Sequence, residues 1–168
     1  KFLSDKRLAP IMETNRGCPY ACTFCCWGQA TQSKINQFPL QTVLDEIEYN
    51  ARHSTNPNGF FYIADGNFGI FKRDLEIAET MQKFSNELNF PKQTFIYFAK
   101  NTTKEVIKIA ATLKSVTSMS MSKQTLNNEV LDNIKRKNIP TEQYDVLRKD
   151  CERHGIDTFC ELIYALPG

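Results

Sequence analysis

The sequence predicts a single α/β domain in which parallel strands alternate with helices. Five extended apolar segments occur along the chain, and the second and third are rich in aromatic and β-branched residues, as strands are. Apolar residues at helical spacing separate these segments. Such an alternation favours a parallel sheet with its crossover helices outside. The chain has 168 residues, the length of one domain, and no linker rich in proline, glycine or serine divides it.

The first two strands are each followed by a helix. APIMET, at residues 9–14, precedes a helix that is predicted to open at Pro39 and to end at the turn sequence NPNG. GFFYIAD, at residues 59–65, precedes the second helix. In both helices apolar residues recur on one face. These residues are Leu40, Val43, Leu44, Ile47 and Ala51 in the first helix, and Ile77, Met81, Phe84 and Leu88 in the second.

The third strand is QTFIYFAK, at residues 93–100, and a helix follows it in which Thr102 and Glu105 resemble a capping box. Next come a fourth strand, two short helices divided by a proline and closed by a glycine, and a fifth strand. These elements are predicted at residues 115–122 (SVTSMSMS), 127–137, 141–154 and 157–166 (DTFCELIYAL), with Pro140 between the helices and Gly155 as the C-cap.

Charge and hydropathy exclude several classes of protein. The net charge of +2 argues against a nucleic-acid partner, and the basic run Lys135, Arg136 and Lys137 is interpreted as a solvated helix face. No apolar run is long enough for a membrane span or a signal peptide, so we expect a cytoplasmic protein without a membrane partner. The chain begins with Lys and stops at ALPG, which suggests a piece excised from a longer protein.

Four of the six cysteines lie within nine positions, as Cys18, Cys22, Cys25 and Cys26. In a reducing compartment such a cluster is more typical of metal or redox chemistry than of disulfides. A structural zinc site usually takes two close pairs of ligands, and no second pair is present. The remaining cysteines and histidines, Cys151, Cys160, His53 and His154, are interpreted as small buried thiols and as surface or packing imidazoles.

Three thiolates suit an iron–sulfur cluster with one iron left open, for the same reason that a catalytic zinc keeps a free position. Adjacent side chains in an extended loop point apart, so Cys25 and Cys26 are not expected to bind one cluster together, and Cys26 is the surplus cysteine. Two functions remain open on these grounds. One is an enzyme that uses the open iron, and the other is a non-catalytic metal-binding module that holds zinc or an electron-carrying cluster.

The stretch ETNRGCPYACTFC, at residues 13–25, closely resembles the cysteine motif of the radical S-adenosylmethionine (SAM) superfamily. The resemblance implies a four-iron four-sulfur cluster bound by Cys18, Cys22 and Cys25, with SAM on the open iron. It further implies reductive cleavage of SAM to a 5′-deoxyadenosyl radical, which abstracts hydrogen from an unknown substrate. A reductant such as flavodoxin or ferredoxin would be a partner. The wording is most similar to members that carry cobalamin in a preceding domain, so any cobalamin would be held outside this chain.

The same resemblance implies a set of SAM-binding residues. The turn DGN stands where the family has a glycine-rich turn for the methionine amino group, with the Asp65 carboxylate and backbone carbonyls as acceptors. Other positions match those that contact the ribose or the adenine. Lys100 could pair with the cofactor carboxylate, but is interpreted as solvent-facing. The implied residues are Phe24 by its backbone, Asp65, Gly66, Asn67, Ser122, Gln124, Glu161 and Ile163.

The final segment, CELIYALPG, carries two further expectations from this resemblance. Glu161 would point inward from an apolar strand to the ribose hydroxyls, and Ala165 stands where glycine is usual. The family core has more strand–helix units than this chain supplies. We therefore expect one incomplete core domain over residues 1–168, a partial (β/α) barrel truncated after about the fifth strand. The missing parts of the parent chain would cover its open edge.

Overall fold

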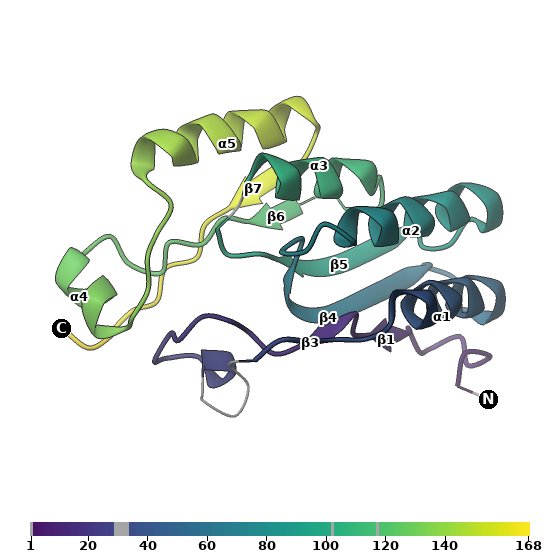
Figure 1. The fold of residues 1–168 in the computed structure, drawn as a ribbon. Helices are drawn as coiled ribbons and strands as arrows, with labels where there is room; N and C mark the ends of the chain where they lie inside the picture. Colours follow the sequence, from purple (N-terminus) through teal and green to yellow (C-terminus); the bar gives the residue numbers. More distant parts are fainter. Residues whose placement is uncertain (1, 29–33, 102, 117) are drawn as a thin grey trace.

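The computed structural model describes residues 2–28, 34–101, 103–116 and 118–168, and shows an α/β fold of parallel strands and helices (Figure 1). Three strands form one parallel sheet in the order β1-β4-β5, and β6 and β7 form a parallel pair. The two groups meet where Thr94 N donates to Ser115 O over 3.1 Å. The strands are β1 (Ile11–Met12), β4 (Phe60–Phe68), β5 (Gln93–Phe98), β6 (Ser118–Ser120) and β7 (Asp157–Phe159).

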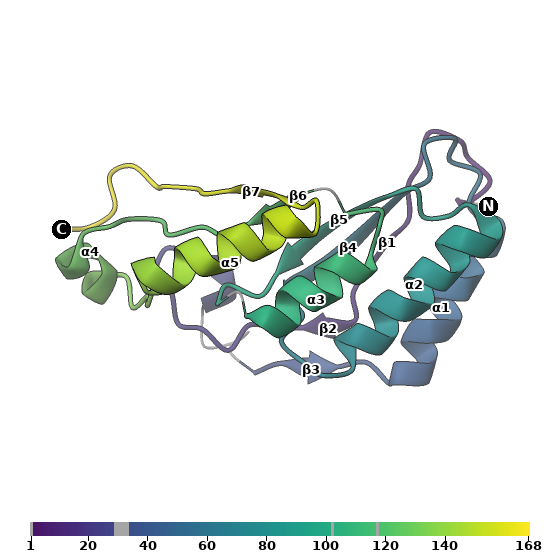
Figure 2. The same ribbon diagram turned by 90° about the horizontal axis from the view of Figure 1, so that it is seen from above.

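The predicted helices are all present in the described part of the chain, and four of them, α1, α2, α3 and α5, lie next to one another along the strands (Figure 2). Their apolar stripes form the core against the sheet, although Leu88 at the end of the second helix is exposed. No helix in the described residues is long and apolar enough to cross a membrane. The helices are α1 (Leu40–His53), α2 (Asp74–Leu88), α3 (Lys104–Thr112), α4 (Asn128–Asn133) and α5 (Thr141–Arg153).

The structure differs from the sequence predictions in several local features. The helix after β5 is capped by Thr103, whose side chain accepts a hydrogen bond from Val106 N over 3.3 Å, and the predicted cap Thr102 lies outside the described residues. A short antiparallel pair, β2 (Asn15–Arg16) with β3 (Asn36–Gln37), was not predicted. The fifth strand ends at Phe159, well before residue 166. The residues that follow are mostly exposed, and within the described residues one isolated bridge, between Gln124 and Leu162, continues the pairing.

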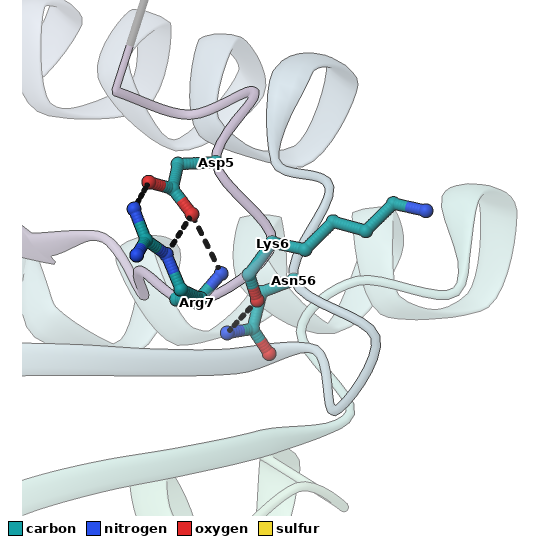
Figure 3. A network of polar contacts seen from close by, with 4 residues as sticks. All are labelled: Asp5, Lys6, Arg7 and Asn56. Atoms are coloured by element: carbon teal, nitrogen blue, oxygen red, sulfur yellow. Dashed lines mark hydrogen bonds and ion pairs between the residues drawn. The ribbon is translucent and has the colours of Figure 1, made fainter.

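The segment that precedes β1 is fixed by local polar contacts (Figure 3). Arg7 binds the carboxylate of Asp5, with Nη2 2.6 Å from Oδ2 and Nε 3.0 Å from Oδ1. Asn56, in the turn between α1 and β4, donates from Nδ2 to Lys6 O over 3.4 Å and to Leu8 O over 3.1 Å. These contacts hold the approach to β1 beside the start of β4.

The parallel strands bring their carboxyl ends to one edge of the sheet, which is where loops gather functional groups in this class of fold. The pairing of β4 with β5 shifts register between Ile63 and Phe68, and Asp65, Gly66 and Asn67 lie within that irregular stretch. The loop that follows β1 and β2 contains the four clustered cysteines. The fold therefore places the cysteine loop and the DGN segment at the same edge.

Candidate functional site

The clustered cysteines differ in their exposure. Cys18 and Cys22 are buried, each 2% exposed, whereas Cys25 is half-buried and Cys26 is exposed at the start of a short 3-10 turn (Cys26–Gly28). Cys25 N donates to Cys22 O over 3.2 Å, which closes a turn between these two residues. All four thiols are free. The loop thus keeps Cys18 and Cys22 inside and turns Cys26 toward solvent.

Two side chains from the sheet reach the sulfurs of the loop. Asn67, at the end of β4, places Nδ2 3.1 Å from Cys18 Sγ. Lys100, two residues after β5, places Nζ 3.3 Å from Cys22 Sγ and 5.3 Å from the centre of the Tyr20 ring. The interpretation of Lys100 as solvent-facing is therefore wrong, because its side chain is half-buried against the cysteine loop.

Asp65 anchors the base of the cysteine loop. Its buried carboxylate accepts hydrogen bonds from Thr14 N over 2.7 Å, Asn15 N over 3.3 Å, Asn15 Nδ2 over 2.7 Å and the Thr14 hydroxyl. Burial raises the pKa of Asp65 to about 6, against the opposing effect of the bonds from Thr14 and Asn15. Because these donors occupy the carboxylate, it does not serve as the acceptor expected for a cofactor amino group. Backbone carbonyls of the DGN segment remain for that role.

A cavity of about 360 Å³ opens beside Cys25 at the carboxyl ends of β4, β5 and β6. Its wall combines polar and charged side chains with aromatic rings. Among the residues named from the sequence, it is lined by Cys25, Gly66, Ser122, Gln124 and Glu161. The wall also includes residues that the sequence did not assign to the site, which are Trp27, Tyr97, Phe98, Lys100, Ser120 and Arg136.

Hydrogen bonds join the segments after β6 and β7 at this cavity. Ser122 Oγ donates to Glu161 Oε2 over 2.7 Å, and Ser120 Oγ donates to the same oxygen over 3.2 Å. Gln124 N donates to Glu161 O over 3.0 Å. The expectation that Glu161 lies buried within an apolar strand is wrong, because β7 has already ended and the carboxylate is exposed. Two serine hydroxyls are its partners, and they hold its carboxylate at the cavity wall.

Arg136 lies between the cavity and α4. Its side chain is only 7% exposed, and Nη2 donates to Ser122 O over 2.6 Å. Within the described residues Nε has no hydrogen-bond partner. The basic run was expected to form a solvated helix face, but α4 ends before the run begins, so none of the three residues lies on a helix. Lys135 and Lys137 are exposed as expected, whereas Arg136 is buried. The cysteine loop contacts the same region, since Thr23 N donates to Ile134 O over 3.1 Å.

The remaining sequence-named residues lie apart from the cavity wall. Phe24 and Ile163 are each 38% exposed, and neither lines the cavity. Asn67 contacts the sulfur of Cys18 and does not line the cavity. Ala165 has a φ of 58°, a conformation that favours glycine, as its position suggested. Among the other candidates for metal ligands, Cys151 is buried, whereas Cys160 is exposed, contrary to expectation, and the two histidines are exposed.

The donor set of the loop fits an iron–sulfur cluster better than a single ion. Across the described residues, no three Cys, His, Asp or Glu side chains are placed to hold one metal ion. A four-iron cluster binds each thiolate at a different iron, so its ligands need not converge on one point. Cys18 and Cys22 are buried and each contacts an N–H donor, and Cys25 lines a cavity. Iron–sulfur clusters are commonly bound in such surroundings.

Comparisons with known proteins agree on one family. The model of the Radical SAM superfamily matches residues 12–168. The chain is 40% identical over 164 residues to the cobalamin-dependent radical SAM methyltransferase TokK from Streptomyces tokunonensis, covering 96% of this chain and 24% of that protein. It is 38% identical over 166 residues to 2-(S-pantetheinyl)-carbapenam-3-carboxylate methyltransferase from Streptantibioticus cattleyicolor, covering 97% and 24%. The chain thus spans about a quarter of the length of these relatives.

Solved structures share the fold at low sequence identity. The radical SAM methyltransferase TsrM from Kitasatospora setae, with cobalamin and a [4Fe-4S] cluster bound, has a TM-score of 0.75 and 19% identity, over 95% of this chain and 32% of that one. The cobalamin-dependent radical enzyme OxsB, with aqua-cobalamin and SAM bound, has a TM-score of 0.69 and 18% identity, over 94% and 24%.

Proposed function

This chain belongs to the radical SAM superfamily, and from this premise we propose that Cys18, Cys22 and Cys25 bind its cluster while SAM occupies the cavity beside Cys25. The family uses a [4Fe-4S] cluster and SAM, and the chain carries the core of a radical SAM enzyme. The observation that carries the proposal is the cavity itself, where Cys25 meets four residues assigned to SAM from the sequence alone.

When bound, the cluster and SAM supply reductive cleavage of the sulfonium to a 5′-deoxyadenosyl radical that abstracts a hydrogen atom from substrate. The chain's own residues then bind the cluster and SAM, orient SAM and shelter the reaction from solvent. The backbone of Gly66, which is half-buried, lines the cavity and offers acceptors for the methionine ammonium. Ser122 offers a hydroxyl and Glu161 a carboxylate for the ribose. Ile163 is proposed to pack on the adenine, and the backbone of Phe24 is proposed to lie near it; both residues are partly exposed.

We further propose that the longer protein is a cobalamin-dependent methyltransferase that takes electrons from a flavodoxin or ferredoxin. Identities of 40% and 38% to two methyltransferases support methyl transfer, and a substrate class does not follow from them. Residues 1–168 are proposed to form one core domain, with β1, β4, β5, β6 and β7 as neighbouring strands of a partial (β/α) barrel. The parallel pairing within β1-β4-β5 and between β6 and β7 supports this arrangement.

The proposal is tested by anaerobic reconstitution of the purified protein with iron and sulfide. We expect about four irons per chain, a spectrum of the reduced cluster that changes when SAM is added, and 5′-deoxyadenosine upon chemical reduction. Stoichiometric zinc without iron would instead support the non-catalytic metal-binding function. A cluster that ignores SAM would equally overturn the proposal.

Replacement of Glu161 is expected to weaken SAM binding without affecting the cluster. In Glu161→Ala the ribose loses a charged acceptor, a loss of about 1.5–3 kcal/mol that corresponds to roughly a 10- to 100-fold weaker affinity. The measurement is a SAM titration of the reduced cluster's spectrum, with iron content determined in parallel. Glu87→Ala, which removes an exposed carboxylate on α2, is the matched control and should bind SAM normally. Equal affinities in both variants would contradict the assigned role of Glu161.

A further inference from the structure

We propose that Lys100 and Asn67 raise the reduction potential of the cluster by donating N–H···S hydrogen bonds to two of its three cysteine ligands. This inference rests on the proposed function, because it requires the cluster to be bound by the cysteine loop. Lys100 Nζ is 3.3 Å from Cys22 Sγ, and Asn67 Nδ2 is 3.1 Å from Cys18 Sγ. No side-chain donor to Cys25 Sγ occurs in the part of the chain that the structure describes.

The physical basis is the charge that reduction adds. One electron increases the negative charge on the cluster and its thiolates, so N–H donors and a nearby cation stabilise the reduced state more than the oxidised state. Burial strengthens this effect, because water screens the interaction less. Cys18 and Cys22 are the two buried thiols of the cysteine loop, and each of them has one of the donors. The donors therefore act where their electrostatic effect is largest.

Lys100 is positioned for this role by its surroundings. Ala99 N donates to Phe68 O over 2.8 Å, which fixes the backbone next to Lys100 at the end of the sheet. The ammonium then lies over the Tyr20 ring, with 5.3 Å between Nζ and the ring centre. A cation over an aromatic face is held in place without the loss of its charge. The side chain thus reaches the loop from the end of the sheet and contacts it at Tyr20 and Cys22.

Asn67 carries a different signature of the same role. Its side chain is 1% exposed, Nδ2 contacts the Cys18 sulfur, and Oδ1 has no hydrogen-bond partner within the described residues. A buried polar atom without a partner costs about 1–3 kcal/mol. The Asn67 amide therefore donates a hydrogen bond to Cys18, a proposed cluster ligand.

Lys100 also lines the SAM cavity, so a carboxylate of bound SAM is an alternative partner for its ammonium. The two roles separate when the potential is measured without SAM. A sulfur contact changes the potential of the SAM-free cluster, whereas a contact to the carboxylate changes only the affinity for SAM.

The experiment is a redox titration of the SAM-free, reconstituted protein, followed by the paramagnetic resonance of the reduced cluster. Lys100→Met should shift the midpoint potential to more negative values at full iron content, and Lys100→Arg, which keeps a charged donor, should shift it less. Asn67→Leu should shift it in the same direction. Lys104→Met removes an exposed cation four residues away and should leave the potential at the wild-type value.

A Lys100→Met protein with full iron content and the wild-type potential would overturn the inference, even if its SAM affinity fell. The Lys100 series decides the matter if Asn67→Leu, at a buried position, does not fold. Failure of the proposed function is recognised separately, since a wild-type protein that assembles no cluster removes the basis of both proposals. If the wild-type cluster responds to SAM but the variants keep the wild-type potential, only the proposed effect of Lys100 and Asn67 on the potential is overturned.

Discussion

Cys25→Ser is expected to abolish cluster assembly, whereas Cys26→Ser should leave it intact. Cys25 is half-buried and lines the cavity, and its backbone closes the turn from Cys22. Cys26 is exposed and begins a 3-10 turn, so its side chain belongs to the solvent side of the loop. With two ligands remaining, a cluster loses one of its iron anchors, and iron content should fall from about four per chain to near zero. Iron and sulfide analysis after anaerobic reconstitution measures the difference.

Cys160→Ser is the matched control for this pair, because Cys160 is also exposed and lies outside the cysteine loop. Its iron content should equal that of the wild type. Full assembly in Cys25→Ser together with loss of the cluster in Cys26→Ser would reverse the ligand assignment. In that case the ligand spacing would be three and three intervening residues, rather than three and two.

Local patterns in the sequence were sufficient for the elements and for part of the site. The apolar stripes of α1 and α2 predicted those helices because helical spacing is a property of neighbouring residues. The resemblance to the family's motifs named Ser122 and Gln124, two residues that do line the cavity. The spacing of the cysteines within one loop singled out Cys25, which lines the cavity. In each case the signal lies within a few residues of the feature that it predicts.

The residues that sequence reasoning misjudged are fixed by contacts between distant segments. Asp65 bonds to Thr14, 51 residues earlier, and Lys100 contacts Cys22, 78 residues earlier. No local pattern contains such pairings. Arg136 was misjudged for a different reason, because the basic run was assigned to a helix that ends at Asn133. Beyond that end the chain turns inward, and Arg136 follows it to the Ser122 carbonyl.

Asp65→Ala is expected to destabilise the fold and loosen the cysteine loop. The substitution leaves buried donors of Thr14 and Asn15 without their acceptor, and orphaned buried groups cost about 1–3 kcal/mol each, so we expect a loss of about 3 kcal/mol in the free energy of unfolding. Iron content after reconstitution should fall as well, because Thr14 and Asn15 begin the loop that carries Cys18. Urea unfolding followed by circular dichroism measures the stability.

Asp45→Ala provides the comparison. This exposed carboxylate on α1 accepts a local hydrogen bond from Gln41, and its removal should change the free energy of unfolding by less than about 0.5 kcal/mol. The pH dependence gives a second readout. Burial raises the pKa of Asp65 from 3.8 to about 6, so between these values the folded chain holds the proton more tightly than the unfolded chain. The contribution of Asp65 to stability therefore decreases as pH rises from about 4 to about 6, and the gap between wild type and Asp65→Ala should narrow over this range. Equal stabilities for Asp65→Ala and Asp45→Ala at every pH would show that Asp65 does not anchor the loop.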